Sequence, residues 1–477
     1  MKKSFVKSLS LLFALSIASI PNLNKIVEVV AGSNDLPTTI NLNDNTEQEI
    51  RNYYSSLSSL PEDELKGANL LKNLKKIISK ENVFYDYGGG TTGVGAIYMI
   101  TDRNWEASPA SSLDPNFGNY DASTNTISNY TYKENPYIFH YYVDRDYQKQ
   151  NPIKHKEDGA SRVSFDKEHI WAKSHGFGLE GDSVVTGAGT DLHHLVAANP
   201  SVNSAAHNAY SYGNVLENAY KAPNDYLINN KRGTPKNSHS QDEVQVVFEP
   251  QDSDKGDIAR ALFYMVARYN YIGDNSQPTK EEPNLSLVNY IIDSKSGFDC
   301  STTKEAAPYG IISDIYNWNK LDHPDQYEIH RNNLIYNNYQ FNRNPFIDFP
   351  QWIELIFNED GTYYSGEKFA NPNIDELNVG SEYVEPPTQS QTDIVQLIRD
   401  NLVLFIIVII VVIIIFIIII VLVNKGKAKI KISKKGKVSV KINSSSKTNK
   451  KKNSTKKTNK KNKLWIRNIL LSWFMEL

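Results

Sequence analysis

The chain has 477 residues, among them 25 glycines, 20 prolines and a single cysteine, Cys300. These numbers exclude a collagen-like repeat, an intramolecular disulfide framework and a cysteine-rich zinc module. The formal net charge of −2 conceals two parts of opposite charge. Residues 424–477 carry 17 lysines, one arginine and one acid, whereas the other 423 residues carry 34 bases and 53 acids.

The N-terminus has the layout of a secretory signal. Three lysines within the first seven residues precede the apolar run 9–20, which is too short to span a membrane. Cleavage near Ser19 and cleavage nearer Ala31 both remain open. We assign residues 1–31 to a signal peptide.

The next segments combine helical and glycine-rich patterns. Apolar residues at helical spacing predict two helices within 45–80, separated by Pro61. Residues 85–109 are glycine-rich and then β-like, with no helical pattern. The glycines do not match the phosphate-binding sequence GxxxxGK[ST], so a nucleotide loop is not predicted there.

The remaining pattern predicts one domain. An amphipathic helix is expected over 258–272 and a last short helix over 352–357. We therefore predict a mostly helical α+β domain with a single core over residues 45–370. Residues 371–401 are acidic and contain prolines, which is typical of a stalk or linker.

A membrane anchor accounts for the charge asymmetry. Residues 402–423 are 22 consecutive apolar residues. As a helix they reach about 33 Å, which is enough to cross a hydrocarbon core of about 30 Å. Because lysine-rich flanks stay in the cytoplasm, the domain is expected outside the cell and the tail 424–477 inside. One transmembrane helix would thus make the membrane a partner of the chain.

The tail itself is of low complexity and too polar to form a core. Its lysines suit attraction to anionic lipid of the inner leaflet, and nucleic-acid binding is the alternative. The apolar ending LWIRNILLSWFMEL has no interpretation from the sequence.

Six of the ten histidines lie within residues 155–207. A strand-like run over 162–165 delivers Glu168 and His169 at its end. A second strand is expected over 192–196, followed by a turn and the start of an alanine-rich helix. Because His193 and His194 are adjacent on this strand, at most one of the two is expected to reach a site formed there.

This arrangement of two strands and a helix brings Glu168, His169 and Asn203 to one place. Carboxylate and amide oxygens are hard ligands suited to Mg²⁺. A neutral histidine beside them can act as general base on a water molecule, and a bound cation stabilises phosphate charge. Asn203 also suits the start of a helix as an N-cap. The residues are a set of parts for phosphodiester hydrolysis.

The sequence resembles the endonuclease I family of secreted bacterial nucleases, which belongs to the His-Me finger (ββα-metal) nucleases. The resemblance covers most of the outward part and rests on several ordered blocks of sequence. These are EIRNYYSSL, EHIWAKS, DLHHL with the following VN, FEPQDSDKGDIARALFYMVARY and the long block WNKLDHPDQYEIHRNNLIYNNYQFNRNPFIDFP.

The resemblance implies a role for each matching residue. His169 resembles the general base, and Glu168 and Asn203 resemble the ligands of Mg²⁺, with Mn²⁺ or Ca²⁺ as alternative ions. Residues that would bind substrate or support the site are His194, His207, Gln340, Arg343 and Asn344, with the segment around Arg343 either facing phosphate or buttressing the site.

One departure from the family concerns a cation. Where the family commonly has an arginine in VNxxRSN, this chain has Ala206 followed by His207. The phosphate contact of that arginine is either missing or supplied by His207, Arg343 or Arg331. Its loss would lower activity.

The resemblance implies a nonspecific endonuclease, here monomeric, that cuts DNA, with RNA as an alternative substrate, and leaves 5′-phosphate and 3′-hydroxyl ends. The acidic outward part predicts weak, salt-sensitive binding through phosphates. Two alternatives remain open. One is another metallohydrolase built from the histidine cluster, although HExxH is lacking. The other is a surface adhesin with a nuclease fold of weak activity.

Overall fold

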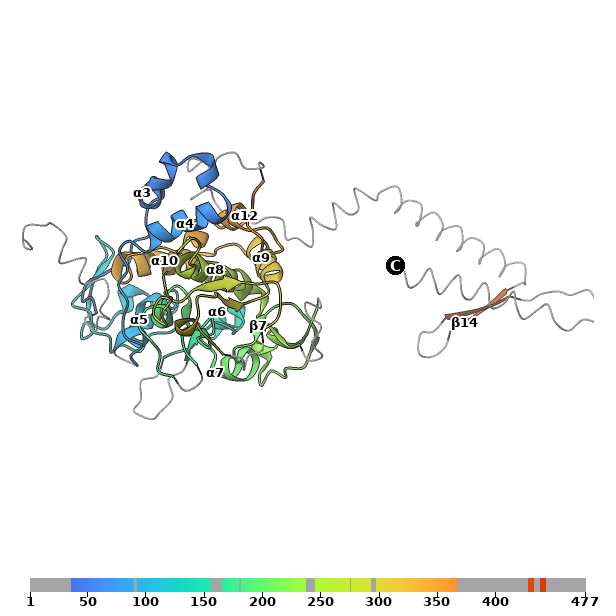
Figure 1. The fold of residues 1–477 in the computed structure, drawn as a ribbon. Helices are drawn as coiled ribbons and strands as arrows, with labels where there is room; N and C mark the ends of the chain where they lie inside the picture. Colours follow the sequence, from blue (N-terminus) through green and yellow to red (C-terminus); the bar gives the residue numbers. More distant parts are fainter. Residues whose placement is uncertain are drawn as a thin grey trace, which may run out of the picture. The chain divides into compact units, whose positions relative to one another are not determined.

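The computed structural model describes residues 36–366 with short gaps, and residues 428–432 and 438–442. The gaps are 90–91, 156–164, 180–181, 237–244, 275 and 293–296. The chain divides into two units, Met1–Tyr383 and Val384–Leu477, which are considered separately (Figure 1).

The expected signal peptide, acidic stalk and apolar segment 402–423 lie outside the described residues and stay predictions. Among the residues that are described, no helix has both the length and the apolar character needed to cross a bilayer. In the lysine-rich tail, β14 (Ala428–Ile432) pairs antiparallel with β15 (Val438–Ile442).

The first unit mixes helices with short strands, as an α+β fold predicts. Its helices are α3 (Glu47–Tyr53), α4 (Gly67–Ile78), α5 (Gly93–Thr101), α6 (Arg145–Gln150), α7 (Pro200–Val202), α8 (Asp252–Tyr269), α9 (Ile312–Leu321), α10 (Gln326–Asn338), α11 (Pro345–Asp348) and α12 (Trp352–Ile356). The pair α3 and α4 and the short helix α12 confirm the sequence patterns in those regions.

The strands form several small sheets rather than one large one. They are β1 (Ile40–Asn41), β2 (Asn119–Asp121), β3 (Thr126–Ser128), β4 (Asp166–His169), β5 (His175–Gly176), β6 (Leu195–Ala198), β7 (Ser211–Tyr212), β8 (Val215–Asn218), β9 (Lys231–Pro235), β10 (Val247–Glu249), β11 (Leu285–Leu287), β12 (Phe298–Asp299) and β13 (Ala307–Tyr309). The largest sheet has the order β7-β10-β9-β8, and β4 pairs antiparallel with β6. Because β1 pairs with β3, the domain includes residues before the predicted boundary at 45.

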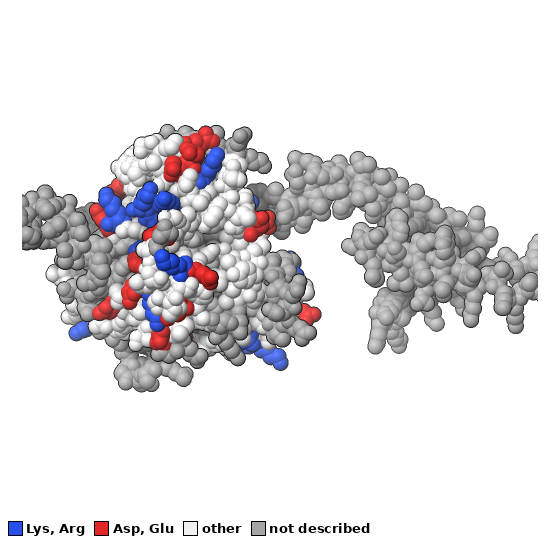
Figure 2. Space-filling view, viewed as in Figure 1, with Lys and Arg blue, Asp and Glu red and all other residues white. Residues whose placement is uncertain are grey.

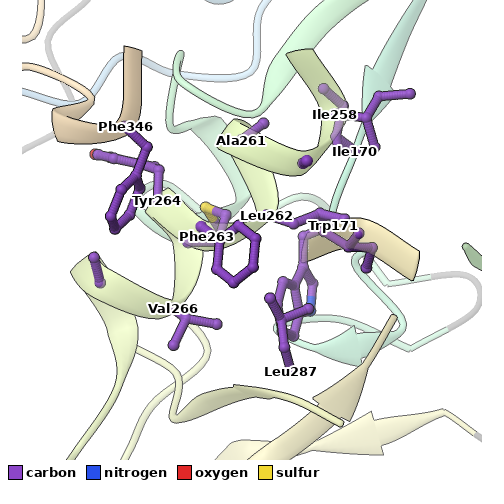
Figure 3. Packing of buried hydrophobic residues seen from close by; sticks show 14 of the residues in the cluster. Ile170, Trp171, Ile258, Ala261, Leu262, Phe263, Tyr264, Val266, Leu287 and Phe346 are labelled. Carbon is purple, nitrogen blue, oxygen red and sulfur yellow. The ribbon is translucent and has the colours of Figure 1, made fainter. Parts of the chain in front are cut away.

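Helix α8 runs through the middle of this unit, with α4 and α9 packed against it (Figure 1). It begins six residues before the amphipathic stretch seen in the sequence, and nearly all of its residues are buried. Figure 3 shows Ile170 and Trp171, which directly follow β4, packed among side chains of α8. The core therefore anchors the end of the strand that carries Glu168 and His169.

The hydrophobic interior consists of two clusters, where the sequence had suggested a single core. The first surrounds α8, and the second surrounds α5. Strand β6 lies between them, because Val196 and Ala198 belong to the first cluster while Leu195 and Ala197 belong to the second. Both faces of β6 are thus buried, which fixes its register with β4.

The prediction of β-structure without a helix after the glycine-rich loop is wrong, since residues 93–101 form α5. Every residue of α5 is buried. A helix buried on all sides has no polar face, so its sequence lacks the 3.6-residue pattern and cannot be distinguished from a buried strand by periodicity.

Arg343 is a structural residue of this unit. Its guanidinium makes two bonds to Asp348, of 2.8 and 2.7 Å, and further bonds to Asn45 and Asn333. The side chain is 1 % exposed. Of the alternatives left open by the sequence, a structural tie is what the contacts support, made to side chains rather than to backbone carbonyls.

Charged side chains are interspersed on the visible face of the first unit. In Figure 2, basic and acidic groups alternate with uncharged surface, and no extended basic patch is seen on the described part of this face.

The pH dependence of stability tests whether His140 is buried in its neutral form. Burial lowers its pKa to about 3, and neither ring nitrogen has a partner among the described residues. The unfolded chain takes up a proton near pH 6.5 and the folded chain does not, so stability falls as the pH drops below that value. In His140→Leu, the loss of unfolding free energy between pH 7 and pH 5, measured by urea denaturation, should be smaller by about 2 kcal/mol. Equal losses in the two proteins would contradict a buried, neutral His140.

A second test concerns Arg343. Removing the guanidinium leaves the carboxylate of Asp348 buried without its cation. We expect Arg343→Gln to lower the unfolding free energy by about 3 kcal/mol and to leave the KM for nucleic acid unchanged at a temperature where the protein is folded. A higher KM with unchanged stability would show that Arg343 faces phosphate instead.

Candidate nuclease site

Strand β4 presents its side chains alternately to two faces. By the period of a β-strand, Asp166 and Glu168 lie on one face and Lys167 and His169 on the other. The contacts of these residues agree with this division. β4 ends at His169, so Glu168 and His169 lie at the end of a strand, where the sequence had placed them.

The face with Asp166 and Glu168 is bridged to the helix that follows β6. Asn203 Nδ2 lies 3.2 Å from Asp166 Oδ2, and His207 Nδ1 lies 2.5 Å from Glu168 Oε1. Asn203 and His207 are four residues apart in the helix, and Asp166 and Glu168 are two residues apart in β4. The strand and the helix are thus joined by two successive contacts.

The helix is placed by its own start and end signals. Asn199 Oδ1 accepts hydrogen bonds from the amides of Ser201 and Val202, and Pro200 occupies the first turn. The helix continues into a π-helical turn, η5 (Asn203–His207), and ends at Asn208 in the left-handed region. Asn199, rather than Asn203, is therefore the N-cap.

Glu168 is 3 % exposed and is held through one of its two oxygens. Its Oε1 accepts hydrogen bonds from the Tyr142 hydroxyl at 2.7 Å and from His207 Nδ1. No described residue donates to Oε2. The carboxylate is thus oriented on one side and open for a ligand on the other.

Both ring nitrogens of His207 are engaged. Nδ1 lies 2.5 Å from Glu168 Oε1, and Nε2 lies 2.9 Å from the Tyr309 hydroxyl, which itself donates to the carbonyl of Tyr210. With both nitrogens engaged and 2 % exposure, His207 supports Glu168 and does not offer a contact to phosphate.

The amide of Asn203 has a defined orientation. An ionised carboxylate only accepts hydrogen bonds, so the atom facing Asp166 is the amino nitrogen and Oδ1 points elsewhere. Burial raises the pKa of Asp166 above its usual value. No hydrogen bond from the described residues reaches Asn203 Oδ1. Two hard oxygen atoms, Glu168 Oε2 and Asn203 Oδ1, therefore remain open, which fits a divalent cation.

On the other face, His169 has the geometry of a base. Its Nε2 donates to the carbonyl of Gly189 at 2.8 Å, which leaves Nδ1 with its lone pair. Burial lowers the pKa of His169 to about 3, so the ring is neutral at physiological pH. The ring stacks on Tyr87 at a centroid distance of 5.8 Å.

The turn η4 (Ala188–Thr190) supplies carbonyls to two imidazoles. Ala188 accepts from His194 Nε2 at 2.7 Å, one residue before the carbonyl that holds His169. The ring of His194 lies 5.7 Å from that of His169. A supporting role for His194, which the resemblance implied, stays a prediction. His193 turns the other way, toward Tyr264, so only one of the adjacent histidines reaches the site.

The turn before β6 is held by residues that the sequence singled out only in part. Gln340 donates to Asp191 Oδ1 and accepts from the amide of Leu192, so it buttresses this turn. Asp191 also accepts from the hydroxyls of Tyr264 and Tyr269. It is fully buried, and nothing in the sequence marked it as a central acceptor.

The other expected supporting residues lie in the interior. Asn344 caps α11 by accepting from Phe346, and its Nδ2 donates to the carbonyl of Arg260. Arg331 is tied to Asp102 and to the carbonyls of Leu192 and Leu195. Neither Arg331 nor Arg343 is placed to replace the family arginine. Ala206 itself is fully buried in the first cluster.

A pocket of about 370 Å³ adjoins Asn203. Its lining residues are Tyr87, Gly89, Gly95, Phe165, Asp166, Lys167 and Asn203. Lys167 is the cation in this lining. Its ammonium lies 3.4 Å from the centroid of the Tyr87 ring and donates to the carbonyls of Tyr87 and Gly88. Burial lowers the pKa of Lys167 to about 8.

The sequence predicted that Glu168, His169 and Asn203 meet in one place, but their contacts lie on two faces of β4. Asn203 contacts Asp166 and His207 contacts Glu168 on one face of β4. His169 lies on the other face, because neighbouring residues of a strand alternate. The sequence did not single out Tyr142, Asp166 or Tyr87 as residues that contact the site. Of the three, only Asp166 could have been found from the sequence, because a residue two positions before Glu168 lies on the same face of a strand.

Several histidines of the cluster that suggested another metallohydrolase bond to the backbone. No group of three or more His, Cys, Asp or Glu side chains with the geometry of a metal site occurs among the described residues. His169, His175 and His194 instead bond to backbone carbonyls.

Comparison with known proteins agrees with the motifs. Residues 66–351 match the family described as Endonuclease I. The chain is 37 % identical over 213 residues to an extracellular ribonuclease of Bacillus amyloliquefaciens, covering 44 % of this chain and 60 % of the relative. It is 38 % identical over 202 residues to an extracellular ribonuclease of Bacillus subtilis (strain 168), covering 42 % of this chain and 56 % of the relative.

The matched regions thus span little more than half of these relatives' own lengths. No solved structure matches the chain. The family match covers more than half of the chain and includes β4, β6 and the helix with Asn203. The chain belongs to the endonuclease I family.

Proposed function

We propose that the chain is a divalent-metal-dependent nuclease that hydrolyses phosphodiester bonds with a water molecule, using a ββα-metal (His-Me finger) site. The observation that carries the proposal is that adjacent residues of β4 are a carboxylate with an open oxygen atom and a neutral base, with a second open oxygen atom on the helix that contacts the strand. Glu168 Oε2 and Asn203 Oδ1 have no hydrogen-bond donors among the described residues, and His169 on the same strand has its Nδ1 unprotonated.

Each residue has a distinct task in this proposal. Glu168 and Asn203 would hold the cation, for which Mg²⁺, Mn²⁺ and Ca²⁺ are candidates. When bound, such a cation stabilises negative charge on the phosphate and the leaving oxygen. His169 accepts the proton of the attacking water at Nδ1, and the Gly189 carbonyl keeps the ring oriented through Nε2.

The substrate is proposed to be nucleic acid bound through phosphates without sequence specificity. The motifs suggested DNA first, whereas the two relatives are named as ribonucleases, which favours RNA as a second candidate. Lys167 is the described cation beside Asn203, and the face in Figure 2 has no extended basic patch among its described residues. Few cationic contacts imply weak binding that salt reduces further.

The proposed location is the outer surface of the cell membrane. It rests on the signal-like N-terminus, the 22 apolar residues at 402–423 and the lysines that follow. The relatives' names describe them as extracellular. Since these segments bear no catalytic residue, the location and the chemistry are separate proposals.

The first test removes the base and the metal in turn. Full-length protein purified in detergent is incubated with plasmid DNA or with RNA in Mg²⁺, and the initial rate is measured. We expect EDTA to abolish cleavage and His169→Ala to lower the rate by about 100-fold or more, because the water loses its proton acceptor.

The matched control is His330→Ala. This histidine on α10 bonds to Asp44 and contacts none of the site residues. Its rate should equal that of the wild type. If His169→Ala cleaves both substrates as fast as His330→Ala does, the proposed chemistry is wrong.

A second test concerns the orientation of the Asn203 amide. In Asp166→Asn, the new amide can donate as well as accept, so it no longer determines which end of Asn203 faces it. We expect Mn²⁺, measured by the electron paramagnetic resonance of the free ion, to bind about 10-fold more weakly. Unchanged Mn²⁺ binding would mean that Asp166 does not orient the ligand.

A further inference from the structure

Tyr142 has an unusual backbone for its residue type. Its φ is 71°, in the left-handed region, and its side chain is fully buried. A bulky residue seldom adopts this conformation, which costs on the order of 1 kcal/mol or more and persists only where the surroundings impose it. The contacts around Tyr142 show what holds the backbone in this conformation and where it places the side chain.

Both backbone polar groups of Tyr142 are held by side chains. Its N–H donates to Asp254 Oδ2 at 2.6 Å, and its carbonyl accepts from Asn230 Nδ2 at 2.7 Å. Asp254 is in turn paired with Arg145 and accepts from Gln251. The strained peptide is therefore fixed by a buried polar network based on α8 and its neighbours.

The side chain delivers one hydroxyl to the site. Tyr142 OH lies 2.7 Å from Glu168 Oε1, and because the carboxylate accepts, the tyrosine donates. The Tyr212 hydroxyl, 3.2 Å away, then donates to the Tyr142 oxygen. The ring packs edge-on against Phe248, which leaves the hydroxyl little freedom.

We propose that Tyr142 is a positioning residue for Glu168: its strained, pinned backbone holds the hydroxyl on Oε1, and the carboxylate thereby presents Oε2 to the cation. This inference rests on the metal site of the proposed function. It adds a residue that the family motifs in this sequence do not include. His207 holds the same oxygen from the helix side, so the carboxylate is fixed from two directions.

A space-filling role and a positioning role for Tyr142 predict different effects on the affinity for metal. If Tyr142 only fills space against Phe248, removing the hydroxyl while keeping the ring leaves the affinity for metal unchanged. If Tyr142 positions Glu168, the carboxylate gains freedom and binds the cation less tightly. Donors that orient a metal ligand typically change metal affinity by about 10-fold or more when removed.

The test uses full-length protein with Tyr142→Phe and measures the dissociation constant of Mn²⁺ by electron paramagnetic resonance. We expect Mn²⁺ to bind about 10-fold more weakly. The KM for nucleic acid at saturating Mn²⁺ should be unchanged, because the tyrosine does not touch substrate. Far-ultraviolet circular dichroism and the urea midpoint establish that the variant is folded.

Tyr132→Phe is the matched control. This tyrosine is also buried and bonds through its hydroxyl to Tyr339, within the second cluster. It should bind Mn²⁺ as the wild type does. Equal affinities in Tyr142→Phe and Tyr132→Phe would overturn the positioning role.

A double-mutant cycle with E168Q shows whether Tyr142 acts through Glu168. If it does, Tyr142→Phe weakens Mn²⁺ binding in the wild type but has no further effect in E168Q. Additive losses overturn the inference, since the tyrosine would then act independently. If E168Q alone leaves Mn²⁺ binding unchanged, the metal site of the proposed function fails, and this is distinct from a neutral Tyr142→Phe beside a weakened E168Q.

Discussion

The site depends on a short strand held between two hydrophobic clusters. Strand β6 places alternate residues in each cluster, and its pairing with β4 transfers that register to Glu168 and His169. A slip of one residue would exchange the faces of these two side chains. The chemistry therefore relies on packing that contains no catalytic group.

The polar groups around Glu168 bind one oxygen of its buried carboxylate and leave the other open for a ligand. Burying a charge is costly unless it is paired and hydrogen-bonded. Tyr142 and His207 both satisfy Oε1, and none of the described residues satisfies Oε2. This asymmetry is what a ligand for a divalent cation requires, because a fully satisfied carboxylate would have no electron pair to offer.

The opposite face of β4 carries His169, whose environment differs from that of Glu168. In the proposed mechanism, His169 must remain neutral and must present a defined nitrogen. Burial supplies the first property, and the carbonyl of Gly189 supplies the second. The same turn orients His194 through the carbonyl of Ala188, and the ring of His194 packs beside that of His169. Glu168 and His169 thus have different surroundings, although they are adjacent on a strand of four residues.

The sequence by itself determined the family, the candidate roles of Glu168, His169 and Asn203, and the helices with a polar face, because ordered motifs and periodic burial are local properties. Only the tertiary structure revealed that α5 is a helix, that Arg343 pairs with Asp348, and that Tyr142 and Asp166 support the site. The contacts of Tyr142 with Glu168 and of Asp166 with Asn203 join residues 26 and 37 positions apart. Arg343 and Asp348 are only five positions apart, but no periodic pattern marks them as a pair. No local pattern encodes which buried donor meets which acceptor, since that choice is made when the two clusters close around β6.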